Sequence, residues 1–156
     1  MKRLFKTIFA ICITITLGGI LAGCGAQKTP ALSDIEASMK QKVGFKDMVK
    51  IDNDKIQRIY GINSSDIESS FVYISSSNVK ADEVAVIKVK DLNKVSEVED
   101  KISKRIEKQS NSFKDYVPDQ YDLVQNNLLK NNSKYILFIV SQNKDKYEEI
   151  FDAAFK

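Results

Sequence analysis

The apolar residues of the chain recur with two different periods, and each period predicts one kind of element. A spacing of three or four residues, as in Val95, Val98, Ile102 and Ile106, is typical of an amphipathic helix. Alternation at every second residue, or a short run of strand-forming residues, indicates a strand. Together these patterns predict helices over residues 33–43, 52–60, 95–113, 119–125 and 145–155, and strands over residues 67–75, 83–90, 128–130 and 135–140.

Individual residues mark where the helices begin and end. Ser33 starts a capping-box pattern, and Asp52 or Asn53 can cap the second helix. Gly61 suits the left-handed residue that ends that second helix. Pro118 suits the first turn of the fourth helix, where a missing N–H costs nothing.

The strands differ in how much of their surface is apolar. Residues 83–90 alternate, which predicts a sheet with one face in the core and the other partly wet. Residues 135–140 are apolar on both faces, so we expect them in the middle of the sheet and not at an edge. The order α-α-β-β-α-α-β-β-α predicts an α+β fold, a mostly antiparallel four-stranded sheet with helices packed against it.

The first 23 residues combine a basic start with an apolar run, which is typical of a secretory signal peptide. The run ends in Leu21-Ala22-Gly23-Cys24, which resembles the lipobox of bacterial lipoproteins, where the cysteine is lipidated and becomes the new N-terminus. An uncleaved transmembrane anchor and a signal peptide without lipid are the alternatives. We therefore expect a signal peptide over residues 1–23, a lipidated Cys24 with a flexible tether over residues 24–31, and a single domain over residues 32–156.

Lipidation of Cys24 would decide where the protein resides. Two acyl chains hold a protein stably on a bilayer, whereas one chain binds only marginally. The lipobox resemblance therefore implies a lipid-anchored protein on the extracytoplasmic face of the cell membrane, with the membrane itself as one partner.

Composition narrows the classes of partner and chemistry. The chain has 24 Lys and Arg against 21 Asp and Glu, and Lys2, Arg3 and Lys6 lie in the leader, which has no acid. Loss of the leader leaves 21 bases for 21 acids, so we expect no nucleic-acid partner. The absence of histidine excludes histidine-based triads and the commonest zinc sites, and we expect no metal and no cofactor.

Several segments of the chain resemble a known family. They are residues 60–62, 72–75 and 81–89, together with Arg105, Gln109, Phe113, Tyr116, Pro118 and Gln120. The family consists of small predicted lipoproteins of Gram-positive bacteria, catalogued as a domain of unknown function, and the resemblance covers nearly all of residues 33–156. It implies secretion, a lipid anchor and a single domain, and it implies no activity and no catalytic residues.

Two classes of function remain open. The first is a non-enzymatic module that binds a protein, a peptide or a small ligand at the cell envelope. The alternative is a surface hydrolase that uses serine or a carboxylate pair, such as Asp66 with Glu68 or Asp82 with Glu83. No serine lies in a Gly-x-Ser-x-Gly elbow, and acids at the ends of strands are usually solvated, so the binding module is favoured. A structural lipoprotein without a soluble ligand is a third possibility.

Arg105 is a candidate for a structural role. Arg105 lies on the border of the apolar stripe of its helix, where a guanidinium can bury its stem and pair with a carboxylate. We expect it to be a structural latch, with Glu83, Asp82 or Asp115 as its partner.

The segment over residues 113–121 is the candidate contact surface, with Tyr116, Gln120 and Tyr121 as its residues. Tyrosine combines a large apolar ring with a polar tip, which is why it is enriched at interfaces. The alternative is that these rings plug the corner between two helices. A contact surface requires accessible side chains, whereas a plug requires buried or internally hydrogen-bonded ones.

Overall fold

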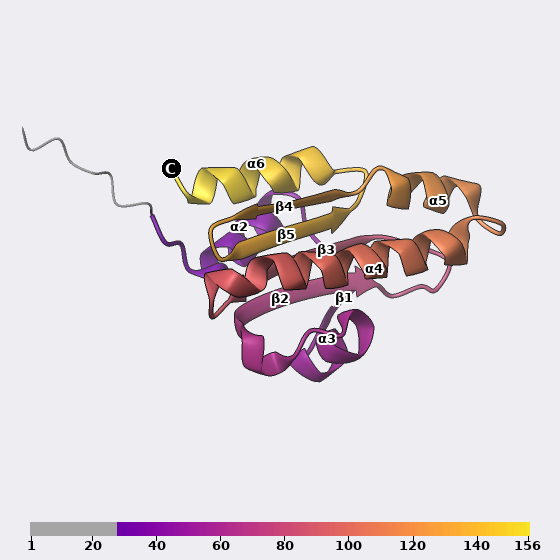
Figure 1. The fold of residues 1–156 in the computed structure, drawn as a ribbon. Helices are drawn as coiled ribbons and strands as arrows, with labels where there is room; N and C mark the ends of the chain where they lie inside the picture. The colour runs from indigo at the N-terminus through magenta and orange to yellow at the C-terminus, as the bar shows by residue number, and fades with distance from the viewer. Residues whose placement is uncertain (1–27) are drawn as a thin grey trace, which may run out of the picture.

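The computed structural model describes residues 28–156, and in it an antiparallel sheet lies between two layers of helices (Figure 1). The strand order is β1-β2-β3-β5-β4, and each neighbouring pair is antiparallel. The strands are β1 (Met48–Ile51), β2 (Ile67–Ser75), β3 (Glu83–Val89), β4 (Leu128–Asn132) and β5 (Tyr135–Val140).

The helices divide between the two faces of this sheet. The long α4 (Val95–Phe113), with α3 (Asn53–Tyr60) and α5 (Pro118–Gln125), covers one face (Figure 1). On the other face lie α2 (Leu32–Lys42) and α6 (Lys144–Ala154). Two short 3-10 turns, η1 (Ser64–Asp66) and η2 (Leu92–Lys94), flank β2 and α4.

The α+β class and the antiparallel pairing are confirmed, but the expected number of strands is wrong by one. The additional strand is β1, which lies in a stretch for which the sequence pattern predicts no element. It has four residues, and two of them, Val49 and Lys50, are exposed, so its own sequence carries no clear alternation. It is a strand because it pairs with the C-terminal half of β2, where Val49 is opposite Ile74 and Ile51 is opposite Val72.

The prediction that one face of the sheet is partly wet is also wrong. Residues of β3 that point away from α4, such as Val84 and Val86, are fully buried beneath α2 and α6. They meet Leu137 and Ile139 of β5 and the ring of Phe151 in α6. As expected, β5 is internal to the sheet, between β3 and β4.

The helix ends follow the sequence signals with one exception. Asp52 caps α3 by accepting the backbone N–H of Lys55 at 2.8 Å, and Gly61 ends that helix with a φ of 71°. Pro118 is in the first turn of α5 as expected. The capping box at Ser33 is not formed, because α2 begins one residue earlier, at Leu32, and Ser33 lies inside it.

The leader (residues 1–23) and Cys24 lie outside the described residues. Of the expected tether, residues 28–31 are described, and they are not wholly detached from the domain. Pro30 is buried, and its carbonyl oxygen accepts a hydrogen bond of 2.8 Å from the hydroxyl of Tyr135. Over residues 28–156, the model contains no helix of the length and hydropathy that a bilayer crossing requires.

Candidate functional site

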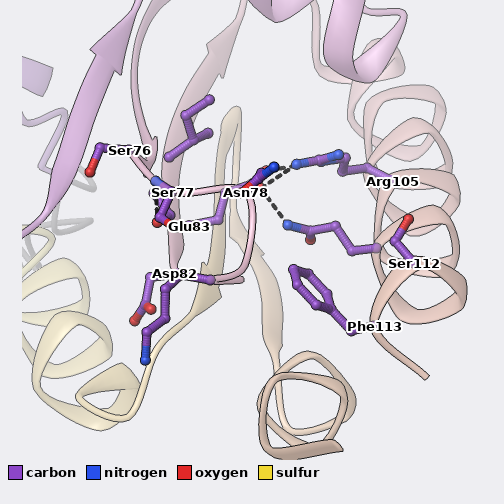
Figure 2. A pocket seen from close by; sticks show the side chains of 12 residues that line it. Ser76, Ser77, Asn78, Asp82, Glu83, Arg105, Ser112 and Phe113 are labelled. Atoms are coloured by element: carbon purple, nitrogen blue, oxygen red, sulfur yellow. Dashed lines mark hydrogen bonds and ion pairs between the residues drawn. The ribbon is translucent and has the colours of Figure 1, made fainter. Parts of the chain in front are cut away.

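A buried carboxylate organises the interior beneath one end of the sheet. Glu83, the first residue of β3, is completely buried and accepts hydrogen bonds from three side chains. Figure 2 shows the bonds from α4 to Glu83. Arg105 Nη2 and Gln109 Nε2 each lie 2.9 Å from Glu83 Oε2, and Arg105 Nε lies 3.5 Å from Oε1. The third donor is the hydroxyl of Tyr60, which also bonds Oε1. We call these four residues the Glu83 cluster.

Three separate elements bring the Glu83 cluster together. Arg105 and Gln109 are one turn apart on α4 and therefore project from the same side of that helix. Tyr60 is the last residue of α3, whose end is fixed by Gly61. Consecutive strand residues point to opposite faces of a sheet, so Glu83 faces α4. In α6, on the other face, burial of Tyr147 and, to a smaller extent, the charge of the neighbouring Asp82 raise the pKa of Tyr147 to about 12.

Burial and charge keep the Tyr60 hydroxyl protonated. Removal from water raises the pKa of Tyr60 well above its usual value, and the negative charge of Glu83 beside it raises that pKa further. The phenol is therefore a permanent donor to Glu83 under ordinary conditions. Because donors surround the carboxylate on both oxygens, its charge is compensated where water is excluded.

This arrangement predicts how Tyr60→Phe changes stability with pH. At neutral pH the variant loses a hydrogen bond to a charged group, which we expect to cost about 1.5–3 kcal/mol of unfolding free energy. The folded-state pKa lies above the unfolded value of about 10, so the tyrosine's contribution is complete below pH ~10 and is lost as pH rises through the folded pKa. Urea unfolding of both proteins at stepped alkaline pH should show the difference shrinking, and a constant difference would contradict the assignment.

A pocket of about 390 Å³ opens over the Glu83 cluster (Figure 2). Arg105, Ser112 and Phe113 project into it from α4, and the loop between β2 and β3 forms the opposite side. The loop contributes Ser76, Ser77, Asn78, Lys80 and Asp82. The lining is completed by Ile74 and Ser75 at the end of β2, by Glu83 and by Gln109.

The chemistry of this pocket is polar and balanced in charge. The lining contains two cations, Lys80 and Arg105, and two acids, Asp82 and Glu83. The side-chain oxygen of Gln109 is buried and has no hydrogen-bond partner within residues 28–156. A buried acceptor without a partner is uncommon and costs stability, so a group that donates a hydrogen bond to it would be favoured.

The structure separates the three residues of the candidate contact surface. Tyr116 is 85% exposed at the turn between α4 and α5. Gln120 is only 9% exposed, and its side-chain oxygen accepts the backbone N–H of Ala81 at 2.9 Å. Tyr121 is half-buried against the core. Gln120 therefore has to be removed from the expected surface, since its side chain holds the β2–β3 loop against α5.

The other candidate residues have separate partners. Of the three acids considered for Arg105, Glu83 is the one it pairs with, and its role as a latch stays a prediction. Asp66 pairs with Lys94 at 3.6 Å and Glu68 with Lys88 at 2.6 Å, so these two acids do not converge. Within residues 28–156, histidine, cysteine, aspartate and glutamate form no group of three that could hold a metal ion.

Sequence reasoning did not identify Tyr60 and Gln109 as site residues. One signal was available: Glu83 is the first residue of a strand that is otherwise mostly apolar, and an acid at such a position needs partners. The helical spacing that placed Arg105 on the border of the α4 stripe also places Gln109 there. Nothing in the sequence says that the end of α3 reaches the same point.

Fold and site define a three-layer α+β domain with a compensated buried carboxylate under a polar pocket. The chain belongs to the family described as "Domain of unknown function (DUF4358)", whose model matches residues 41–141. The matched region contains the five strands, α3 to α5 and the whole Glu83 cluster. No curated protein and no solved structure matches the chain.

Proposed function

We propose that the protein is a lipid-anchored, non-enzymatic binding module on the extracytoplasmic face of the cell membrane, in the manner of a Gram-positive lipoprotein. The anchor is Cys24, supported by the basic and apolar leader and by the lipobox-like Leu21-Ala22-Gly23-Cys24. The short stretch between Cys24 and the buried Pro30 would keep the domain close to the bilayer.

Metabolic labelling tests the anchor. Cells that express the full chain and are fed an alkyne fatty acid should incorporate label into the wild-type protein. Cys24→Ala should abolish it, because the Cys24 sulfur is the atom that would carry the acylated glyceryl group. The variant should also keep its leader, which a mass measurement detects. Equal labelling of the two proteins would disprove lipidation at Cys24.

The ligand site is the pocket over the Glu83 cluster. The observation that carries this proposal is the buried side-chain oxygen of Gln109, a lining residue, which has no hydrogen-bond partner within residues 28–156. It accompanies the guanidinium of Arg105, which has N–H groups beyond those used by Glu83. A peptide backbone offers a donor to Gln109 and an acceptor to Arg105. The balanced charges of the lining favour such an uncharged group over an anion.

The lining also offers apolar contact for a peptide side chain. Ile74 and Phe113 supply apolar walls inside the pocket. Val79, in the loop that borders the pocket, is 56% exposed. A concave site with apolar walls and a few convergent polar groups is the usual form of a binding pocket. The ligand we favour is therefore a peptide segment of another envelope protein.

The hydrolase alternative has less support. Glu83 already accepts from Tyr60, Arg105 and Gln109, so neither of its oxygens is available to take a proton from a nucleophile. Asp82, the other acid of the lining, directly precedes Glu83, and successive residues of an extended chain point to opposite sides. Two acids directed to opposite sides of a strand do not make a glycosidase pair.

Site-directed photocrosslinking in living cells tests the binding site. A photoreactive residue at Asn78, on the pocket rim, should capture a peptide or protein, whereas the same residue at the exposed Asn63 should not. Gln109→Met should reduce capture at residue 78, since methionine has similar volume and no acceptor. Its melting temperature is measured in parallel to separate lost binding from lost folding.

The outcomes of this experiment are distinct. Equal capture at residues 78 and 63, or capture at residue 78 that a folded Gln109→Met variant leaves unchanged, would exclude the pocket as the ligand site. Cleavage of the captured peptide by purified wild-type protein would favour the hydrolase alternative.

A further inference from the structure

The chain enters the domain at the end of the sheet opposite the Glu83 cluster. Pro30 is fixed there by Tyr135, the first residue of β5, which lies beside Lys88 near the end of β3. Glu83, at the start of β3, lies beside Val140 at the other end of β5. Figure 1 shows residues near 30, the β4–β5 turn and the C-terminus together at one end, and the α4–α5 turn at the other.

The surface around the entry point carries lysines and one apolar side chain. We call Lys28, Lys90, Leu92 and Lys134 the exit face. Leu92 is 54% exposed in η2, which directly follows β3. Lys134 Nζ lies 2.6 Å from the carbonyl oxygen of Lys90, and its own carbonyl accepts the backbone N–H of Val89 at 3.0 Å, so these residues are adjacent.

Lys28 joins the exit face through a second pocket. This pocket, of about 270 Å³, is lined by Lys28, Lys88 and Lys134 with a single acid, Glu68. That acid is paired with Lys88 at 2.6 Å. The remaining charge of the lining is positive.

The nearby acids do not neutralise the exit face. Asp66 is paired with Lys94 at 3.6 Å. Asp91 keeps its negative charge while its side chain accepts the backbone N–H of Asn93 at 3.0 Å, but the three lysines of the exit face outnumber it. Lys28 and Lys90 are exposed, so their charges face outward beside Leu92. Lysines around an exposed apolar side chain form a surface that suits the headgroup region of an anionic bilayer.

From this placement we infer that the exit face contacts the headgroups of anionic phospholipids and orients the domain on the membrane. The inference rests on the proposed lipid anchor. Cys24 precedes Pro30 by six residues, which span at most about 20 Å, so the anchored membrane cannot be far from the exit face. The charge of the exit face complements that of the lipid.

This orientation has a consequence for the ligand pocket. Glu83 and Val89 are at the two ends of β3, and six residue steps along a strand span about 20 Å. With the exit face on the bilayer, the pocket over the Glu83 cluster lies about 20 Å farther from the membrane than the exit face does. It then opens toward proteins of the envelope and away from the lipid.

A fluorescence experiment on the full chain tests the contact. The purified protein is reconstituted into phosphatidylcholine vesicles with and without phosphatidylglycerol, and its attachment is verified by flotation. An environment-sensitive dye is attached to Asn93→Cys, beside Leu92, or to Tyr116→Cys at the other end. The protein without an added cysteine measures any labelling of Cys12 or Cys24.

At residue 93 we expect a blue shift and several-fold stronger quenching by a headgroup spin label when phosphatidylglycerol is present. At residue 116 neither should change. Lys28→Glu with Lys90→Glu should remove the effect at residue 93, because the reversed charges repel the lipid. The matched pair Lys108→Glu with Lys114→Glu, exposed lysines on and just after α4, should leave it intact.

Equal quenching at residues 93 and 116, or equal quenching at residue 93 in neutral and anionic vesicles, would overturn the orientation while leaving the anchor in place. Persistence of the effect in Lys28→Glu with Lys90→Glu would also overturn it. A protein that fails to float with either vesicle would refute the anchor, and the orientation with it.

Discussion

Arg105→Ala is expected to lower the free energy of unfolding by about 3–5 kcal/mol, because it leaves a fully buried carboxylate without its only cationic partner among the cluster residues. Tyr60 and Gln109 would remain as donors to Glu83, but neither carries a charge. For a domain of this length the melting temperature should fall by roughly 10 °C or more. Thermal and urea unfolding of the purified domain measure the effect.

Two further variants distinguish the stability lost with the buried Arg105–Glu83 pair from the stability lost on removing any arginine. Arg58→Ala, on the exposed side of α3, should change stability by less than about 0.5 kcal/mol. Adding Glu83→Gln to Arg105→Ala should recover part of the lost stability, since a neutral amide is less costly to bury alone than a charge. An unchanged melting temperature for Arg105→Ala would mean that Arg105 is no latch.

The parts of the fold that sequence predicts well are those determined locally. The bounds expected for the helix over residues 95–113 are those observed for α4, because its apolar stripe is long. Asp52 and Gly61 mark the ends of α3 because the cap and the left-handed residue act within one turn. β1 was missed because four residues with two exposed positions become a strand only by pairing with β2.

The site was predictable only in part, for a related reason. The border position of Arg105 on α4 and the nearby acids suggested an ion pair, and Glu83 was among the expected partners. The other partners of Glu83 are Tyr60 at the end of α3 and Gln109 one turn further along α4. Only tertiary packing brings Tyr60 close to Glu83. Gln120 is not an accessible residue of the expected contact surface. Sequence could not predict this, because the hydrogen bond that its side chain accepts from Ala81 depends on tertiary packing.

The burial of the sheet's second face likewise depends on partners that alternation cannot reveal. Residues 83–90 alternate between two sets of mostly apolar side chains, and Lys88 and Lys90 in one set suggested a wet face. In the structure Lys88 is half-buried and pairs with Glu68 at the end of the strand, where it can remain polar. Lys90 is exposed just beyond the end of β3, and Val84 and Val86 of that face are covered by α2 and α6.

Phe151→Ala in α6 is therefore expected to cost about 3–5 kcal/mol of unfolding free energy, comparable to the loss of Arg105. The Phe151 ring is completely buried in the cluster that includes Leu137 and Ile139 of β5, and it packs edge-on against Phe155 at a centroid distance of 5.1 Å. Removing it leaves a cavity at the centre of the α6 layer. Urea unfolding followed by circular dichroism measures the loss.

Glu149→Ala, an exposed position two residues earlier on the same helix, is the matched control and should have an effect within about 0.5 kcal/mol. Both substitutions end in alanine on one helix, so their difference isolates burial from helix propensity. If Phe151→Ala lowered the free energy of unfolding as little as Glu149→Ala, α6 would not be packed against the sheet. Val84, Val86 and their neighbours would then face water, which is the wet face that the alternation of residues 83–90 predicts.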